Sequence, residues 1–473
     1  MPLQLPGYYF DEERNRYFPI SSRPSKNGAT SRQGDASSAR GAPSSEPTSQ
    51  LTTSEFSRAK LREPRYIDTL PRSLFTHERA RQRHRWEAAT FAATSRSEHT
   101  SPPLIGELTT FTKATNTAGD THFLVGDSYG WICRATVPYS EHDSYHALPA
   151  QDFWGMDFNL NPSSEISSMC SSGARCVATS AGTAAKITVM DLDSASLHSM
   201  LYTLNGLHDI WTSHLSGRSL VIGAERQAVY IEDIDVGPPL RTLETHSDIF
   251  SVHKSDSLVY TGARNGDIAR FDLRSSKPDV LGPLLPGRFA ADCHAAAGDT
   301  SRRNAQVRKR TARHGASRTS VVHLDIIREW QLLVSHMDGR LATYDLRFLR
   351  DTRPVRSFSG HVNTLTRRLG IAVDPTQNFL FAAGEDGWIR GWSLQTGQPL
   401  RPPSLSSPVT NGSKPPPADY SARPLLATRF LKPIVSMQIA EEPGGLCLYA
   451  AGPSGDTLPS VHKYFLGDAS TVS

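Results

Sequence analysis

The sequence predicts an all-β fold, a seven-bladed β-propeller preceded by a disordered and helical N-terminal extension. From about residue 104 the chain alternates short runs of β-branched and aromatic residues with Gly, Asp or Asn, which is the pattern of many short strands joined by turns. Seven such units follow one another. Once the extension and two inserts are set aside, the units average about 44 residues, the length of a four-stranded blade. With 34 glycines and 32 prolines, the chain does not suit a long-helix protein.

The first 57 residues divide into a motif and a linker. Residues 1–20 carry an aromatic N-terminal motif, whose aromatic side chains are Tyr8, Tyr9, Phe10, Tyr17 and Phe18. Aromatic residues at this density predict either a short linear motif for a partner or a strap packed on the propeller edge. Residues 21–57 are expected to be a disordered linker, because ten serines and a single large aliphatic residue between positions 21 and 54 bury too little surface to fold.

Residues 58–99 are predicted to form a basic helical arm. Phe75, Trp86, Ala89 and Ala93 fall near one helical face between residues 70 and 93, whereas arginines at 79, 81, 83 and 85 occupy the remainder. This pattern suits a helix that lies on a partner protein or on the main domain.

Three units in the second half of the chain, at 258–272, 332–345 and 380–392, align without gaps. In each, a turn glycine precedes an aromatic residue by five positions. An Asn-Gly or Asp-Gly pair supplies the positive φ angles of a tight hairpin turn, and the aromatic residue is expected to pack between neighbouring sheets. Weaker copies occur at 123–137, 176–191, 220–233 and 434–465. The propeller is therefore expected over 100–466, with inserts at 275–316 and 402–424.

The composition and motifs argue against several function classes. The net charge of +4 gives no general basic surface, and five cysteines at irregular spacings form neither a disulfide framework nor a zinc ribbon. No nucleophile elbow, phosphate loop or metal-ligand cluster occurs, so we expect no enzyme activity, no catalytic residue, no cofactor and no metal. The N-terminus lacks the apolar core of a signal peptide and no run of about 18 apolar residues occurs, which predicts an intracellular protein of the nucleus or cytoplasm without a membrane partner.

The insert 275–316 and its flank carry a basic cluster. Seven arginines and lysines lie between Arg302 and Arg318, without an acidic residue among them. Such a cluster is either a nuclear-localisation signal or a solvated loop. No aromatic residue interleaves with the cluster, so base stacking and a nucleic-acid partner are not favoured.

Two consecutive units end in the same way, with an aromatic residue, Asp, Leu and Arg. The charged pairs are Asp272 with Arg274 and Asp345 with Arg347. Each Arg follows the strand where it emerges onto a face of the propeller, and its planar guanidinium suits bidentate pairing with a partner's carboxylate or carbonyls. The alternative is a solvated turn in which each Arg pairs with its own Asp.

The unit at 359–393 resembles a WD repeat. It begins with Gly360-His361 and reaches Asp386 and Trp392, so these three side chains are expected to form a structural hydrogen-bond network across the blade. The small hydroxyl residue that often completes this network in the family is replaced by Ala382 or Ala383, which leaves the network incomplete. The resemblance implies that His361, Asp386 and Trp392 are structural and not catalytic.

The paired endings resemble the 16-residue motif by which WD-repeat receptors dock on the damaged-DNA-binding adaptor of cullin-4 ubiquitin ligases. The second copy fits better, with apolar Leu332 and Leu333, small Ser335, acidic Asp338 and apolar Leu341 before its Asp-Leu-Arg ending. The first copy departs from the motif, with Asn265 in place of an acid and Arg270 in place of an apolar residue.

The N-terminal motif and the late blades are similar to the adaptor- and cullin-4-associated factor 4 branch of these receptors. The resemblance implies a non-catalytic substrate receptor whose adaptor-binding residues are Arg274, Arg347, Asp272, Asp345 and Asp338, and whose other partner is an unknown substrate protein. A second interpretation is a WD-repeat scaffold of another nuclear or cytoplasmic complex. A third, from a different class, is a propeller enzyme or nucleic-acid binder.

Overall fold

A computed structural model describes most of the second half of the extension and nearly all blades. The described residues are 8–11, 16–19, 72–94, 97–139, 148–162, 164–194, 198–237, 239–275, 280–283, 319–348, 354–401, 425–442, 445–453 and 459–466. The chain divides into two compact units, Met1–Leu70 and Pro71–Ser473. The linker predicted over 21–57, the basic cluster at 302–318 and the insert 402–424 lie outside the described residues.

The first unit contains a two-stranded antiparallel hairpin. Strand β1 (Tyr8–Asp11) pairs with β2 (Arg16–Pro19), so that Tyr8 lies opposite Pro19 and Asp11 opposite Arg16. The described part of the aromatic motif, 8–11 and 16–19, is therefore extended backbone. This geometry supports an ordered strap or a strand-like linear motif, the two alternatives that the sequence leaves open.

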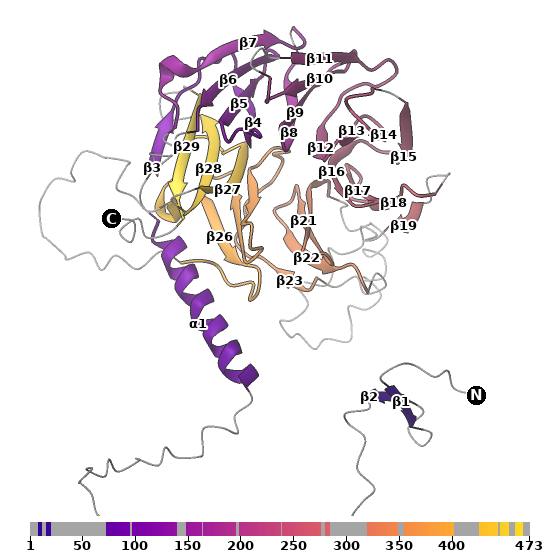
Figure 1. Ribbon diagram of the computed structural model, residues 1–473, viewed down its shortest axis with the longest axis vertical. Helices are drawn as coiled ribbons and strands as arrows, with labels where there is room; N and C mark the ends of the chain where they lie inside the picture. Colours follow the sequence, from indigo (N-terminus) through magenta and orange to yellow (C-terminus); the bar gives the residue numbers. More distant parts are fainter. Residues whose placement is uncertain are drawn as a thin grey trace, which may run out of the picture. The chain divides into compact units, whose positions relative to one another are not determined.

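The second unit is a ring of seven antiparallel sheets, which confirms the predicted seven-bladed propeller (Figure 1). Blades one to six follow chain order, and we number the strands of each blade from the ring axis outward. The strands are β4 (Leu108–Thr115), β5 (Thr121–Asp127), β6 (Trp131–Val137) and β7 (Gly155–Asn159) in blade one; β8 (Ile166–Ser172), β9 (Arg175–Ser180), β10 (Lys186–Asp191) and β11 (His198–Thr203) in blade two; β12 (Thr212–Ser216), β13 (Ser219–Gly223), β14 (Gln227–Ile231) and β15 (Leu240–Glu244) in blade three; β16 (Ile249–Ser255), β17 (Leu258–Ala263), β18 (Ile268–Asp272) and β19 (Val280–Pro283) in blade four; β20 (Val321–Ile327), β21 (Gln331–His336), β22 (Leu341–Asp345) and β23 (Arg356–Ser357) in blade five; and β24 (Ile371–Val373), β25 (Phe379–Ala383) and β26 (Ile389–Ser393) in blade six.

The last blade joins both ends of the propeller. Its inner three strands are β27 (Ser436–Glu442), β28 (Gly445–Pro453) and β29 (Pro459–Phe465), and its outer strand is β3 (Ser97–Thr100). Val461 pairs with Thr100 and His462 with His99. Residues 97–99, which the sequence assigned to the helical arm, thus belong to the propeller, because β29 would otherwise be left with an unpaired edge.

The alternating strand directions give the ring two faces with different loops. First strands of adjacent blades pack against one another around the axis, for example β4 on β8 and β16 on β20. The loops that join first to second strands and third to fourth strands share one face, which we call the bottom face. The loops that join second to third strands, and one blade to the next, share the opposite or top face.

The aromatic residues that follow the turn glycines pack between blades, as predicted. Phe271 and Trp392 are fully buried and Tyr344 nearly so. Each follows a glycine with a positive φ angle, of 84° at Gly266 and at Gly339 and 78° at Gly387. At Gly387 a side chain would also collide with the carbonyl oxygen of Phe430, so both the conformation and the space require glycine there.

Helix α1 (Arg72–Ala92) precedes the propeller and contacts it through its C-terminal half. Phe91 and Ala92 are buried, and Phe91 packs edge-on against Phe379 with 4.9 Å between ring centroids. His84 stacks on the other side of Phe379 at 4.8 Å and its Nε2 lies 2.7 Å from Oγ of Ser393. The predicted apolar face was therefore wrong in part: Trp86 is 64% exposed, because the side of the helix that carries His84, Phe91 and Ala92, nearly opposite to Trp86, packs on blade six.

Two findings bear on the membrane and redox expectations. None of the helices in the described ranges combines the length and the apolar character needed to cross a bilayer. Four cysteines within those ranges, Cys133, Cys170, Cys176 and Cys447, are free thiols.

Candidate protein-interaction site

The two Asp-Leu-Arg sequences lie on the bottom face of adjacent blades. Arg274 follows β18 in blade four, and its backbone N–H donates to Oδ1 of Asp272 at 3.0 Å. Its side chain folds back on the same carboxylate, with Nη2 2.6 Å from Oδ2. The hydrogen bonds from Arg274 lower the pKa of Asp272 to about 2. The guanidinium is nevertheless 74% exposed.

Arg347 repeats this arrangement in blade five and adds an aromatic support. Its backbone N–H donates to Oδ1 of Asp345 at 2.9 Å, and its Nη2 lies 2.8 Å from Oδ2. The guanidinium carbon lies 3.9 Å from the ring centroid of Trp330, within cation–π range, and the side chain remains 56% exposed. Because Trp330 and Asp345 hold it from two sides, Arg347 is presented in a fixed orientation, and exposed Phe348 lies next to it.

The own-Asp pairing predicted as an alternative is thus present, yet each arginine retains free hydrogen-bonding capacity. Only Nε and Nη2 of Arg274 and Arg347 bond to the carboxylates. Among the described residues, Nη1 of either side chain has no hydrogen-bond partner. A guanidinium that is held by one edge can bind a second acceptor through the other edge.

The same turn in blades two and three carries an acid in place of arginine. The backbone N–H of Asp193 donates to Oδ1 of Asp191 at 3.1 Å, and that of Asp235 donates to Oδ1 of Asp233 at 2.9 Å. These are the same side-chain-to-backbone turns that Asp272 and Asp345 make. The turn therefore does not need Arg at this position. The sequence repeat Asp-x-Asp signals these two turns, but the analysis of the sequence alone missed them.

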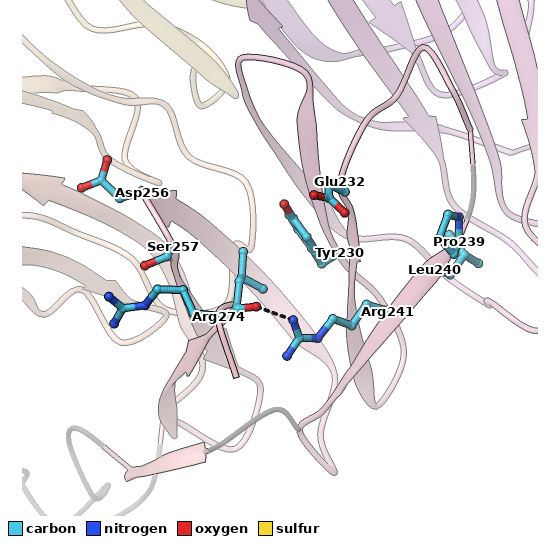
Figure 2. Close-up of a pocket in the computed structure, with 9 residues that line it drawn as sticks. Tyr230, Glu232, Pro239, Leu240, Arg241, Asp256, Ser257 and Arg274 are labelled. Carbon is cyan, nitrogen blue, oxygen red and sulfur yellow. Dashed lines mark hydrogen bonds between the residues drawn. The ribbon is translucent and has the colours of Figure 1, made fainter. Parts of the chain in front are cut away.

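A cavity of about 510 Å³ opens on the bottom face between blades three and four, beside Arg274 (Figure 2). Its lining is mixed, and Nη1 of Arg241 donates to the carbonyl of Leu273 at 2.6 Å. Glu232 and Asp256 add carboxylates to the same wall. A partner side chain that pairs with Arg274 would have a recess of mixed charge next to it.

Helix α1 meets blade six at the bottom edge, in the next blade after Arg347. Its contacts, Phe379 at the start of β25 and Ser393 at the end of β26, both lie at the bottom ends of their strands. The described side chains from Glu78 to Arg83 are exposed, as is Trp86. The helix and the two arginines therefore occupy three consecutive blades on the same side of the ring.

The structure separates Asp338 from the other residues expected to bind an adaptor. Asp338 lies in the loop between β21 and β22, on the top face, where its Oδ2 accepts from Nε of Arg340 at 2.7 Å. Strand β22 runs from that loop to Asp345, so its full length separates Asp338 from Arg347. We correct the expectation accordingly: Asp338 does not share a surface with the arginines.

The three WD-repeat residues of blade six do not bond to one another. Nε1 of Trp392 donates to the carbonyl of Ser359 at 3.0 Å. The ring nitrogens of His361 lie 3.1 Å from the carbonyl oxygen of Ala383 and 3.3 Å from that of Gly339. Asp386 instead binds Arg390 through two contacts of 3.0 and 2.5 Å. The incomplete network predicted from the alanines at 382 and 383 thus takes the form of three separate anchors.

No constellation of the described residues suggests catalysis or metal binding. Groups of three or more His, Cys, Asp or Glu side chains with metal-binding geometry do not occur within the described ranges. The exposed arginines, the cavity and the helix can recognise another protein, and they hold no activated nucleophile.

Comparison with known proteins agrees with this picture. The family model "WD domain, G-beta repeat" matches residues 352–393, which run from β23 through blade six. A WD repeat-containing protein 21 of Schizosaccharomyces pombe is 28% identical over 169 residues, which are 35% of this chain and 33% of that protein. A DDB1- and CUL4-associated factor 4 of Bos taurus is 34% identical over 107 residues, which are 22% of this chain and 20% of that protein. The matches thus span about a third of the first relative and a fifth of the second.

Proposed function

We propose that this seven-bladed propeller, in which residues 352–393 match a WD40 repeat, is a non-catalytic protein-interaction subunit, and specifically the substrate receptor of a cullin-4-type ubiquitin ligase that docks on the ligase adaptor through its bottom face. In this proposal Arg274 and Arg347 bind the adaptor, and Asp272 and Asp345 orient them. Helix α1 supplies a second contact through its exposed side chains from Glu78 to Arg83.

The observation that carries the proposal is the matched pair of arginines in adjacent blades. The same turn in blades two and three carries Asp193 and Asp235, so the fold does not require arginine there. Both guanidinium groups are exposed, and neither Nη1 has a hydrogen-bond partner within the described ranges. Two preoriented bidentate donors on adjacent blades suit a partner that offers carboxylates or carbonyls at a fixed spacing.

The similarity to the bovine DDB1- and CUL4-associated factor 4 supports the choice of partner. That protein's name associates it with the adaptor and the cullin. Because the match covers only 22% of this chain, the partner is proposed and the experiment below tests it directly.

The test is a pull-down of the full chain against the purified cullin-4 adaptor, with an Arg274→Ala, Arg347→Ala double variant beside the wild type. We expect binding by the wild type and a loss of at least about tenfold in the variant, as for truncated arginine anchors in other interfaces. Arg218→Ala is the matched control, since Arg218 is 67% exposed on the bottom face of blade three and pairs with Asp233 and Asp235, the acids of the turn after β14. Equal adaptor binding by the wild type and the double variant would refute the assignment of these arginines.

A scaffold role in another nuclear or cytoplasmic complex is the alternative function. It predicts that the wild type does not bind the adaptor, whereas the propeller still captures other proteins.

A further inference from the structure

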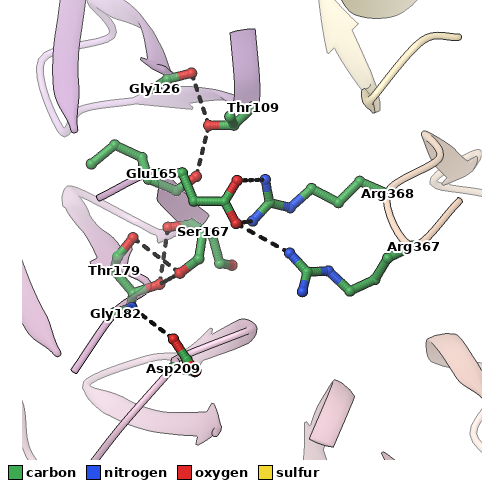
Figure 3. Close-up of polar contacts among 11 residues, drawn as sticks. Thr109, Gly126, Glu165, Ser167, Thr179, Gly182, Asp209, Arg367 and Arg368 are labelled. Atoms are coloured by element: carbon green, nitrogen blue, oxygen red, sulfur yellow. Dashed lines mark hydrogen bonds and ion pairs between the residues drawn. The ribbon is translucent and has the colours of Figure 1, made fainter. Parts of the chain in front are cut away.

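A second surface lies at the centre of the top face, where two arginines reach across the ring axis; we call this position the channel mouth. Arg367 and Arg368 precede the first strand of blade six, and Glu165 precedes the first strand of blade two, on the far side of the ring. Nη1 and Nη2 of Arg368 lie 2.9 and 2.7 Å from the two oxygens of Glu165, and Nη2 of Arg367 lies 3.2 Å from one of them (Figure 3).

Two cations therefore share one carboxylate in a partly buried place. Burial, followed by repulsion from Arg368, lowers the pKa of Arg367 to about 10, so the side chain stays charged at neutral pH. Although burial favours protonation of Glu165, the charges and hydrogen bonds of Arg368 and Arg367 hold the pKa of this carboxyl below its usual value. Nε of Arg368 is buried without a partner among the described residues. The site thus has more donors and more positive charge than Glu165 can satisfy.

Aromatic rings form the other side of this site. The guanidinium carbon of Arg367 lies 4.2 Å from the ring centroid of Trp211 and 5.7 Å from that of Phe250. These rings stand at the top ends of blades three and four and meet edge to face at 5.8 Å. Arg367 is held by stacking on one side and by Glu165 on the other, which fixes it at the channel mouth.

The loop that carries the arginines is braced and presents an apolar residue to solvent. The backbone N–H and the hydroxyl of Thr364 both donate to Oε2 of Glu385 at 2.6 Å. Asn363 bonds to both backbone groups of Thr366, at 2.8 and 2.9 Å. Between these anchors Leu365 is 80% exposed. The loop therefore aims its arginines inward and its leucine outward.

Exposed apolar side chains continue over the top loops of the next two blades. Leu431 lies before the first strand of blade seven, and Ile105 and Tyr129 lie in top-face loops of blade one. Nζ of Lys432 lies 3.0 Å from Oε1 of Glu107, which links the loops of blades seven and one. Large apolar residues exposed in three consecutive blades, beside a cationic centre, are typical of a protein-binding surface.

We propose that this top-face surface binds an extended segment of a partner protein in which an acidic side chain, flanked by apolar residues, pairs with Arg367 and Arg368. The apolar neighbours of that acid lie on Leu365, Leu431 and Ile105. We assign a carboxylate as the ligand because the carboxylate of Glu165 already binds Arg368 there through both of its oxygens. The inference applies to a ligase receptor and to a scaffold alike, so it does not rest on adaptor docking.

The test is a selection of random displayed 12-residue peptides on the full chain, followed by affinity measurement of one selected peptide made synthetically. We expect enrichment of Asp or Glu flanked by apolar residues. Arg367→Gln with Arg368→Gln should weaken the synthetic peptide at least about tenfold, and amidation of its acid should do the same. Arg274→Ala with Arg347→Ala is the control and should leave the affinity unchanged, which separates this surface from the adaptor site.

Glu165→Gln distinguishes a binding role of the arginines from a purely structural one. Removal of the internal carboxylate should tighten the acidic peptide by several-fold, provided that thermal unfolding confirms the fold. Selection of basic or uncharged sequences, unchanged affinity in the double Gln variant, or clearly tighter binding of a phosphorylated peptide than of the acidic one would each overturn the proposal.

Discussion

At the scale of single residues, the blades depend on a few positions where the backbone conformation or the burial of the side chain restricts which amino acid can stand there. Trp392 fills the space between blades five and six and anchors its indole N–H on Ser359. Gly387, in the turn before it, has a φ of 78° and sits against the carbonyl of Phe430. The strong sequence signal of this blade therefore reflects packing and turn geometry, and says nothing about binding.

Gly387→Ala should destabilise the propeller by roughly 3 kcal/mol, since alanine pays both the strain of a positive φ and a collision with backbone. Gly360→Ala is the matched control. Its φ is 91°, but an added Cβ would meet nothing within 4 Å, so about 1 kcal/mol is expected. Urea unfolding of both variants measures the difference, and equal destabilisation would contradict the predicted collision.

At the scale of the element, helix α1 shows why periodicity alone did not identify the buried face. Trp86, Ala89 and Ala93 gave an apolar stripe, but Phe91, Ala92 and His84 make the contact with blade six. Trp86 stays exposed, in a helix whose described first half is also exposed. A sequence with so many arginines does not define a single apolar face of the helix. Which face is buried is decided by the packing against Phe379 in blade six.

Phe91→Ala should release α1 from blade six, because it removes a buried ring that packs on Phe379 and Phe381. A loss on the order of 3 kcal/mol corresponds to amide exchange roughly a hundredfold faster in the C-terminal half of the helix. Hydrogen–deuterium exchange measures this change. Trp86→Ala, on the exposed face of the same helix, should leave the exchange rates unaltered, and a similar acceleration there would show that Phe91 does not hold the helix.

At the scale of the whole molecule, the two proposed binding surfaces lie on opposite faces of the ring. The sequence predicted the seven blades because the turn glycines and following aromatics recur at a fixed offset. It also placed Arg274 and Arg347 correctly at strand ends, since their Asp-Leu-Arg sequences follow third strands. The contact between Glu165 and Arg368 could not be predicted from the sequence. These residues are 203 positions apart and meet only because the blades close into a ring. Asp338 was misplaced for the converse reason: closeness in sequence to Arg347 hides the strand between them.

The stability of the ring should fall as the pH drops from 7 to 5. Burial lowers the pKa of His214 to about 4, of His253 to about 3 and of His323 to about 4, on first strands of consecutive blades. Below pH 6.5 these histidines bind protons in the unfolded chain but not in the folded one, so protonation favours unfolding. Asp325, 3.2 Å from His253, has the opposite effect on stability. Burial raises its pKa to about 6, so the folded form binds a proton before the unfolded chain does and is stabilised as the pH falls.

Together these four groups should lower the free energy of unfolding by about 4 kcal/mol between pH 7 and pH 5. Urea titrations at pH 7 and pH 5 measure it. His323→Gln should reduce the difference between the two pH values by about 2 kcal/mol, whatever its effect at pH 7. A stability that is constant over this range would contradict the burial of these histidines in the neutral form.

The pairing of β3 with β29 has a consequence for how the protein is made. Residues 97–100 are among the first of the propeller to leave the ribosome, and their partner at 459–465 is among the last. Throughout translation of the six intervening blades the growing chain is an open arc, with an unpaired leading strand and a fresh sheet edge at its growing end. The ring therefore cannot close until its last blade has been made, and we expect the open arc to be more exposed to aggregation than the closed ring.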